Sequence, residues 1–151
     1  MSKQEAIDRT LKNSRVPKGF YLKDSVLIPG GVLGLWTDHA IKKGEYIGEY
    51  LGKVLTPEEA KNVKSKYLFD VTGKVPGSTK RKSLFVLDGK NKKYSSFVRY
   101  ANAANSLGEQ NAYFEQKNKR IFLRARKNIK ANTEILTWYG DETKDIISEG
   151  Y

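Results

Sequence analysis

Short runs that alternate apolar and polar residues dominate the chain, and this period of two predicts β-strands. Residues 42–55 are expected to form two short strands with a bend, because glycines interrupt their apolar positions. Residues 29–36 begin with turn-forming proline and glycine and lead into an apolar pair. The other strand predictions cover residues 19–28, 67–71, 83–89, 96–100 and 119–129, and the ordered pattern ends with residues 134–140.

One helix is predicted over residues 56–66. Thr56 suits the N-cap, Pro57 suits the first helical position, and Glu58 and Glu59 place acids in the first turn. The chain contains no repeat with a period of roughly 20–50 residues and no low-complexity tract. Many short strands with one or two helices predict a single domain of the mainly β or α+β class.

The composition narrows the chemistry that this domain can perform. Of the 151 residues, 38% are hydrophobic and 30% are charged, which is typical of a globular domain. No apolar run approaches the roughly 20 residues of a membrane span, so no membrane association is expected. The absence of cysteine excludes disulfides, thiolate catalysis and cysteine zinc sites, and His39 is the single histidine. Metal-based and histidine-based catalysis are therefore not expected, which leaves carboxylates, amides, phenols and backbone groups.

The charge is strongly positive and unevenly distributed. The formal net charge is +11, whereas the last eleven residues sum to −3, so residues 1–140 carry +14. A field of this sign attracts nucleic acid or another polyanion. A solvated basic surface without a partner explains such short runs equally well. The basic residues cluster at 61–66, 80–82, 90–93 and 117–130.

Asparagines are concentrated in the stretch RYANAANSLGEQNAYF, residues 99–114, between two predicted strands. Asparagine is a poor strand former and a costly core residue, since a buried amide must find hydrogen-bond partners. Asn102, Asn105 and Asn111 therefore indicate a site or an irregular interior backbone.

Two generic motifs give little information. The stretch PGGVLGL resembles a glycine-rich phosphate loop only loosely, because no lysine-serine pair and no βαβ unit accompany it. A glycosidase-like carboxylate pair is compatible with the 17 acids, but salt bridges to the 28 basic residues explain these acids more simply.

Four segments in order carry a more specific signal. They are VPKGFYLKDSVLIPGGVLGLW (16–36), KYLFDV (66–71) with FVLDGKNKKYSSFVRYAN (85–102), RYANAANSLGEQN (99–111) and EILTWYGDE (134–142). Together they resemble the SET domain, specifically its PR-domain branch. The resemblance implies a SET-type β-clip of several short sheets with few short helices and a C-terminal pseudoknot. Its expected divisions are an N-terminal arm or short helix (1–16), the SET/PR-like domain (17–142) and an acidic tail (143–151).

The resemblance implies S-adenosylmethionine as cofactor and methyl transfer to a lysine side chain as the reaction. Polar groups of the pseudoknot must be paired, and asparagine amides suit that task. Asn111 is expected to be structural, and Asn105 to be a loop residue. The residues expected to bind the cofactor are Gly31, Val32, Leu33, Gly34, Leu35, Tyr67, Asn102 and Ala103.

Tyr139 matches the catalytic tyrosine of the family and would orient the amine; taken alone, it would be a strand-end aromatic. Tyr50 matches a channel aromatic, and ordinary strand packing explains it nearly as well. Trp36 and Trp138 are expected in the core. The expected lysine channel consists of Tyr50, Tyr67, Leu68, Phe69, Thr137 and Tyr139.

Several positions depart from the family pattern. Val32 stands where glycine is commoner, Ala103 replaces the histidine of most SET domains, and Leu123 stands where active PR domains have a further channel tyrosine. A catalytically silent module that binds protein or nucleic acid is therefore the alternative to a methyltransferase. The expected partners are a protein substrate such as a histone tail, and nucleic acid at the basic surface, without zinc. The expected location is intracellular, and nuclear in a eukaryotic host.

Overall fold

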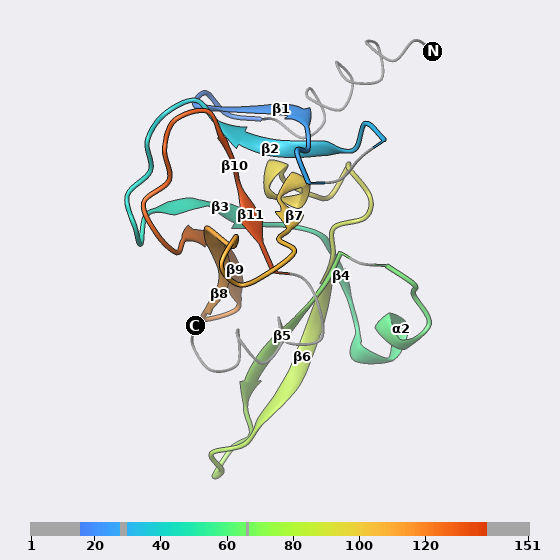
Figure 1. Cartoon of the computed structure of the whole chain (residues 1–151). Coiled ribbons are helices and arrows are strands. Elements are labelled where there is room, and N and C mark those ends of the chain that lie inside the picture. Colours follow the sequence, from blue (N-terminus) through green and yellow to red (C-terminus); the bar gives the residue numbers. More distant parts are fainter. Residues whose placement is uncertain (1–15, 28–29, 66, 139–151) are drawn as a thin grey trace.

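The computed structural model describes residues 16–27, 30–65 and 67–138, which form short strands in four small sheets (Figure 1). One α-helix and one 3-10 helix accompany them, so the mainly β class with few helices is confirmed. The strands are β1 (Phe20–Asp24), β2 (Leu33–Thr37), β3 (Tyr46–Tyr50), β4 (Lys53–Leu55), β5 (Leu68–Lys74), β6 (Arg81–Asp88), β7 (Asn102–Ala103), β8 (Ala112–Lys117), β9 (Arg120–Ala125), β10 (Thr133–Glu134) and β11 (Leu136–Thr137). The helices are α2 (Pro57–Lys61) and the 3-10 helix η1 (Phe97–Tyr100).

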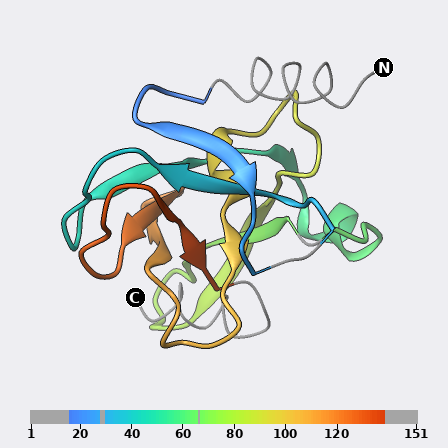
Figure 2. The same cartoon turned by 45° about the horizontal axis from the view of Figure 1, so that its top comes forward.

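The sheets join segments that are distant in the sequence. Three of them have the orders β1-β2-β10, β3-β9-β8 and β4-β6-β5, and all their pairs are antiparallel. The fourth is the parallel pair β7–β11. Figure 1 shows β1 and β2 at the top and the long β5–β6 hairpin projecting at the bottom, and Figure 2 shows the same sheets from a tilted view.

The core lies where these sheets face one another. The rings of Tyr50, Phe69 and Phe114 form an aromatic cluster with centroid distances of 4.4, 4.5 and 5.7 Å. All three side chains are buried, as is Leu35 of β2. Burial of such large apolar side chains contributes about 1.5–3 kcal/mol each, so this cluster stabilises the packing of β3, β5 and β8.

The helix prediction is confirmed by its capping groups. The Thr56 hydroxyl accepts a hydrogen bond from the backbone N–H of Glu59 at 3.1 Å. The Glu59 carboxylate accepts from the backbone N–H of Thr56 at 3.0 Å, which completes a capping box. Helix α2 ends at Lys61 rather than at residue 66 and buries none of its side chains, so it lacks the packing that would extend it.

The strand prediction for residues 96–100 is wrong. The segment forms the 3-10 helix η1, and all four of its residues are buried. A strand at the edge of a core buries alternate residues, whereas this tight turn is enclosed on every side. The hydroxyl of Ser96 donates to the carbonyl oxygen of Glu49, which fixes the start of the turn against β3.

The last described strands lie between two other parts of the chain. β10 pairs with β2, and β11 pairs with β7 in parallel. Between them, the Ile135 N–H donates to the Leu35 carbonyl oxygen at 2.7 Å. This insertion of the C-terminal segment between β2 and β7 is the arrangement expected of a SET-type pseudoknot.

Candidate functional site

Three segments meet at the carboxylate of Glu134. The amide nitrogen of Asn102 donates to the Leu33 carbonyl oxygen at 3.1 Å and to Glu134 Oε2 at 3.3 Å. Glu134 Oε1 accepts from the backbone N–H of Val26 at 2.9 Å, and the Glu134 side chain is only 3% exposed. A buried carboxylate is costly unless it is hydrogen-bonded, so these contacts fix the first motif, the asparagine motif and the closing motif together.

Gly34 is required at this meeting point. A Cβ at this position would run into the Glu134 carboxylate and would lie 3.2 Å from the Asn102 amide nitrogen. The absence of a side chain therefore permits the close approach of β2 to Asn102 and Glu134. The preceding turn is exposed: Gly31 has a left-handed φ of 78°, and Val32 is 38% exposed.

Asn111 is a structural residue, as expected. Its side-chain nitrogen donates to the Glu134 carbonyl oxygen at 2.9 Å, and its side-chain oxygen accepts from the Leu136 N–H at 2.8 Å. Its backbone N–H also donates to the Leu136 carbonyl oxygen at 2.9 Å. One buried amide thus pairs the backbone on both sides of Ile135. Asn105 lies exposed in a loop, also as expected.

Two polar oxygens near this junction have no hydrogen bond to any described residue. One is the side-chain oxygen of Asn102, because both hydrogen bonds of this side chain are made by its nitrogen. The other is the hydroxyl of Thr137, which is fully buried. Ala103, which follows Asn102 in β7, pairs with Thr137 of β11. Buried polar atoms are rarely left unpaired, so the Thr137 hydroxyl indicates a partner in a ligand or in side chains outside the described residues. The Asn102 side chain is only half-buried, so its oxygen is accessible to a ligand.

A second cluster surrounds Tyr50 and Tyr67. The Tyr50 hydroxyl donates to the Tyr67 carbonyl oxygen at 2.6 Å, and the N–H of Gly89 donates to the same oxygen at 3.0 Å. Tyr50 is 1% exposed, and burial raises its pKa well above the ordinary value. The Tyr50 phenol therefore remains protonated and acts as a hydrogen-bond donor.

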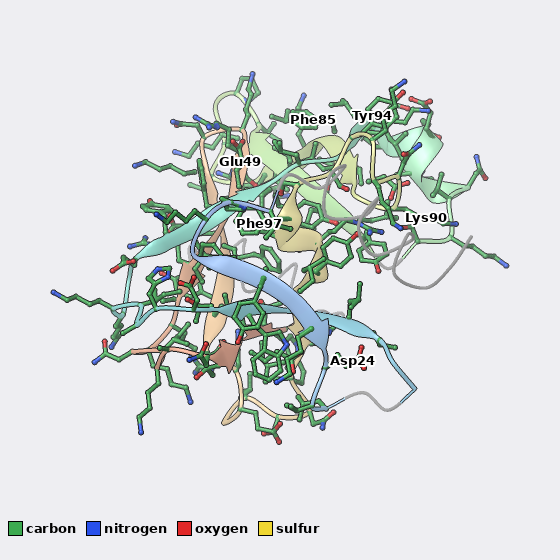
Figure 3. The ribbon with its side chains drawn as sticks, turned by 90° about the horizontal axis from the view of Figure 1, so that it is seen from above. Asp24, Glu49, Phe85, Lys90, Tyr94 and Phe97 are labelled. Atoms are coloured by element: carbon green, nitrogen blue, oxygen red, sulfur yellow. The ribbon has the colours of Figure 1, made fainter. Side chains whose placement is uncertain are left out.

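Arg99 of η1 holds the surroundings of Tyr67 in place. Its guanidinium donates to the carbonyl oxygens of Gly89 at 2.8 Å and Lys90 at 3.0 Å. The same group lies 4.6 Å from the centroid of the Tyr67 ring and 5.0 Å from that of Tyr100. In Figure 3, the labelled Phe97, which belongs to η1 as Arg99 does, lies inside the molecule, and the labelled Lys90 lies toward its edge. Because only Ala101 separates η1 from Asn102, one short segment connects the two clusters.

Most of the other expected site residues that the structure describes are buried or half-buried. Phe69 is buried beside Tyr50, and Leu68 is half-buried on the same strand. Leu123 is fully buried in β9. Trp36 is 7% exposed and stacks on Tyr21, so it belongs to the packed interior as expected, although its indole nitrogen has no partner among the described residues. Tyr139 and the tail 143–151 lie outside the described residues, as does all but the last residue of the 1–16 arm.

Sequence reasoning missed two residues of this site. Glu134 stands at the start of an apolar strand, and a single acid in such a run could have been identified as a buried acceptor. Arg99 is the first residue of the asparagine motif, but only the fold brings the carbonyl groups of residues 89 and 90 to its guanidinium.

The described residues contain neither a metal-binding cluster nor a membrane-spanning helix. No group of three or more histidine, cysteine, aspartate or glutamate side chains in residues 16–27, 30–65 and 67–138 is arranged to hold a metal ion. No helix within those ranges is long and apolar enough to span a membrane.

Comparison with known proteins identifies the family. The family model described as "PR domain zinc finger protein 2, PR domain" matches residues 22–149. The human histone-lysine N-methyltransferase PRDM7 is 30% identical over 145 residues, which cover 87% of this chain and 28% of that protein. The PRDM6 proteins of Bos taurus and Homo sapiens are 32% identical over 120 residues, which cover 76% of this chain and 19% of each relative. The chain thus spans less than a third of the length of these relatives.

Two solved structures have the same fold. The methyltransferase domain of human PR domain-containing protein 2 gives a TM-score of 0.69 at 23% identity, covering 93% of this chain and 88% of that chain. The SET domain of the RIZ1 tumor suppressor (PRDM2) gives 0.66 at 23% identity, covering 99% and 85%. The chain therefore belongs to the PR-domain family and has the SET-type fold.

Proposed function

We propose that this PR domain is a protein-lysine N-methyltransferase that uses S-adenosylmethionine. The observation that carries the proposal is the meeting of Leu33, Asn102 and Glu134, where the glycine motif, the asparagine motif and the closing motif contribute to one polar site. In the sequence, Tyr139, the residue proposed for catalysis, follows the last residue of β11 by two positions. The PRDM7 relative, named a histone-lysine N-methyltransferase, supports the same assignment.

The residues present fit the amino-acid end of the proposed cofactor. Its ammonium group requires acceptors, and the site offers the free oxygen of Asn102, the Leu33 carbonyl oxygen and the Glu134 carboxylate. The absence of a side chain at Gly34 lets the Glu134 carboxylate lie against this backbone. Gly31, Val32, Leu35 and the backbone of Ala103 complete the proposed binding set. When bound, the cofactor supplies an electrophilic methyl group on a positive sulfur.

The chain's own residues prepare the lysine. A free lysine has a pKa of about 10.4 and must lose its proton before it attacks. A channel formed by Tyr50, Tyr67, Leu68 and Phe69 would lower that pKa by removing water around the amine. The Tyr139 phenol would align the amine, and carbonyl oxygens would stabilise the positive charge near the reacting carbon.

Thr137 is the proposed determinant of the number of methyl groups transferred. It is fully buried in β11, two residues before Tyr139, and its hydroxyl lacks a partner among the described residues. A side chain of this size leaves more room beside the amine than an aromatic ring would.

A silent PR module is the second candidate function, and one observation favours it. Leu123 is fully buried in β9, at the position where active PR domains have a further channel tyrosine. A leucine supplies no hydroxyl to the channel. If that hydroxyl is required, the domain binds its partner without methylating it.

The proposed substrate is a protein lysine, for example in a histone tail, which would require a nuclear location. The net charge of +11 disfavours a basic peptide unless acids lie near the channel. Glu49 is already paired with Arg120 at 2.7 Å, which reduces its contribution to such a site.

Two measurements test the proposal. Calorimetry should detect binding of S-adenosylmethionine, and tritium transfer from labelled cofactor to histones or a cell extract should detect catalysis. Tyr139→Phe should keep cofactor binding and lose methyl transfer by roughly 100-fold or more, since one positioned polar group is removed from the transition state. Equal rates would remove Tyr139 from catalysis, and cofactor binding without any transfer by the parent protein would favour the silent module.

A further inference from the structure

The outer face of the β3–β9–β8 sheet carries aromatic and basic side chains in alternation. Cross-strand pairs place Arg124 between Tyr46 and Tyr113, and Phe122 opposite Glu49 and Glu115. The Arg124 guanidinium lies 4.5 Å from the Tyr46 ring centroid, and the Arg120 guanidinium lies 5.0 Å from that of Phe122. These contacts form a continuous row of flat groups across the three strands.

An open groove lies at one end of this row. It has a volume of about 290 Å³ and is lined by Tyr46, Lys117, Asn118, Arg120 and Phe122. Tyr46 is 48% exposed, and its ring meets Phe122 edge-on at 5.4 Å. An exposed aromatic side chain of this size offers a face on which another planar ring can stack.

The groove lies at the tip of the basic β8–β9 hairpin, and the basic β5–β6 hairpin is bonded to the opposite face of the same sheet. Gln116 of β8 accepts a hydrogen bond from the Thr72 N–H of β5 at 3.1 Å and donates to the Thr72 carbonyl oxygen at 2.7 Å. Segments 71–87 and 116–133 contain eleven basic residues and no acid. Those exposed near the tips are Lys74, Lys80, Arg81, Lys82, Lys117, Lys119 and Arg120.

The two arginines of the aromatic row are already paired with acids. Arg120 binds Glu49 with two hydrogen bonds of 2.9 and 2.7 Å, and Arg124 binds Glu115 at 2.9 Å. Figure 3 shows nitrogen-ended side chains gathered around Glu49. Because the acids neutralise the arginines, the arginines act mainly as rigid flat surfaces. Lys117 and Lys119 have no ion pair with an acid among the described residues, and they supply positive charge at the tip.

We propose that this hairpin surface, meaning the Tyr46–Phe122 groove and the basic tip of the β8–β9 hairpin, binds single-stranded nucleic acid. A base would stack on Tyr46 and Phe122, and the phosphates on either side would contact Lys117 and Lys119. A duplex hides its base faces and would use only the lysines. An acidic protein segment would use the same lysines but lacks the regularly spaced planar rings that suit the groove.

Fluorescence anisotropy with labelled single-stranded DNA and RNA oligomers tests this proposal. Affinity should fall steeply as salt rises, and Lys117→Ala with Lys119→Ala should reduce the slope of log K against log salt by about 1.4. Tyr46→Ala should weaken single-strand binding by about 5-fold or more, the lower end of base stacking on an aromatic ring. Tyr46→Phe keeps the ring and should bind as the parent protein does.

Matched controls separate this surface from general charge. Lys18→Ala with Lys61→Ala removes the same charge at exposed positions, just before β1 and in α2, and should change affinity little. Figure 1 shows β1 and α2 away from the β8–β9 hairpin. Circular dichroism and melting temperature verify that each variant folds. No binding at low salt would overturn the proposal. Equal affinity for duplex with no effect of Tyr46→Ala, or stronger binding of poly-glutamate than of oligonucleotides, would also overturn it.

Discussion

The replacement of Asn111 by alanine provides a direct measure of how strongly the junction depends on one amide. In the parent protein, this side chain bonds the Glu134 carbonyl oxygen at 2.9 Å and the Leu136 N–H at 2.8 Å. Asn111→Ala leaves the Glu134 carbonyl oxygen and the Leu136 N–H without these side-chain hydrogen bonds. The backbone bond from the residue 111 N–H to the Leu136 carbonyl oxygen is retained. Because Glu134, Leu136 and Asn111 are all buried, water does not readily replace the lost amide.

The expected loss follows from the cost of unpaired buried groups. Each group left without a partner costs about 1–3 kcal/mol, so the two together predict a loss of about 2–6 kcal/mol. For a domain of this size, 1 kcal/mol corresponds to about 2–4 °C in melting temperature, and the expected decrease is therefore about 4–24 °C.

Urea unfolding followed by tryptophan fluorescence measures this loss, with Asn105→Ala as the matched control. Asn105 is exposed in its loop, so its replacement should change the free energy of unfolding by less than about 0.5 kcal/mol. If Asn111→Ala were as stable as the control variant, the amide would not be the group that pairs this interior backbone.

Three further results are expected. Gly34→Ala should destabilise the domain by about 1–3 kcal/mol in urea unfolding and weaken cofactor binding in calorimetry, because the new Cβ meets the Glu134 carboxylate. Gly108→Ala is the control: its Cβ would meet only a Ser106 oxygen at 3.8 Å, so stability and cofactor binding should not change. Folding raises the pKa of Tyr50, so the protein should lose stability as pH rises above about 10, where the phenol ionises in the unfolded chain only. Urea unfolding as a function of pH should show a smaller loss of stability for Tyr50→Phe than for the parent protein over that range. Arg99→Lys should lower stability by about 1–3 kcal/mol in thermal melts, since lysine does not replace both carbonyl bonds, and an unchanged melting temperature would contradict this role.

Local sequence patterns were sufficient for those elements whose stability is local or whose faces alternate. The capping box of α2 is written in four consecutive residues, and β9 alternates basic and apolar residues as a half-buried strand does. η1 was wrongly predicted because its form depends on distant partners, namely Glu49 and the carbonyl groups of residues 89 and 90. The closing segment was predicted as one run, yet it divides at Ile135 into two strands that belong to different sheets.

The candidate site was anticipated from motif resemblance, and its geometry was not. The motifs name Leu33 and Asn102, but only the fold shows that Glu134 joins them and that Gly34 has no room for a side chain. The structural role of Asn111 was expected from its match to the later asparagine of the family motif, and its bonds to Glu134 and Leu136 confirm it. The proposed roles of Tyr50, Thr137 and Tyr139 stay predictions.

The position of β10 beside β2 has a consequence for the order of events during synthesis. β2 is an inner strand, but its second neighbour is made about a hundred residues later, as the bond between Val26 and Glu134 also illustrates. At roughly 5–20 residues per second, the ribosome leaves this edge of β2 unpaired for about 5–20 s. During that interval the nascent chain exposes an unpaired, partly apolar strand edge, which favours aggregation or chaperone binding. Chaperone dependence should therefore be highest for nascent chains that stop before residue 133.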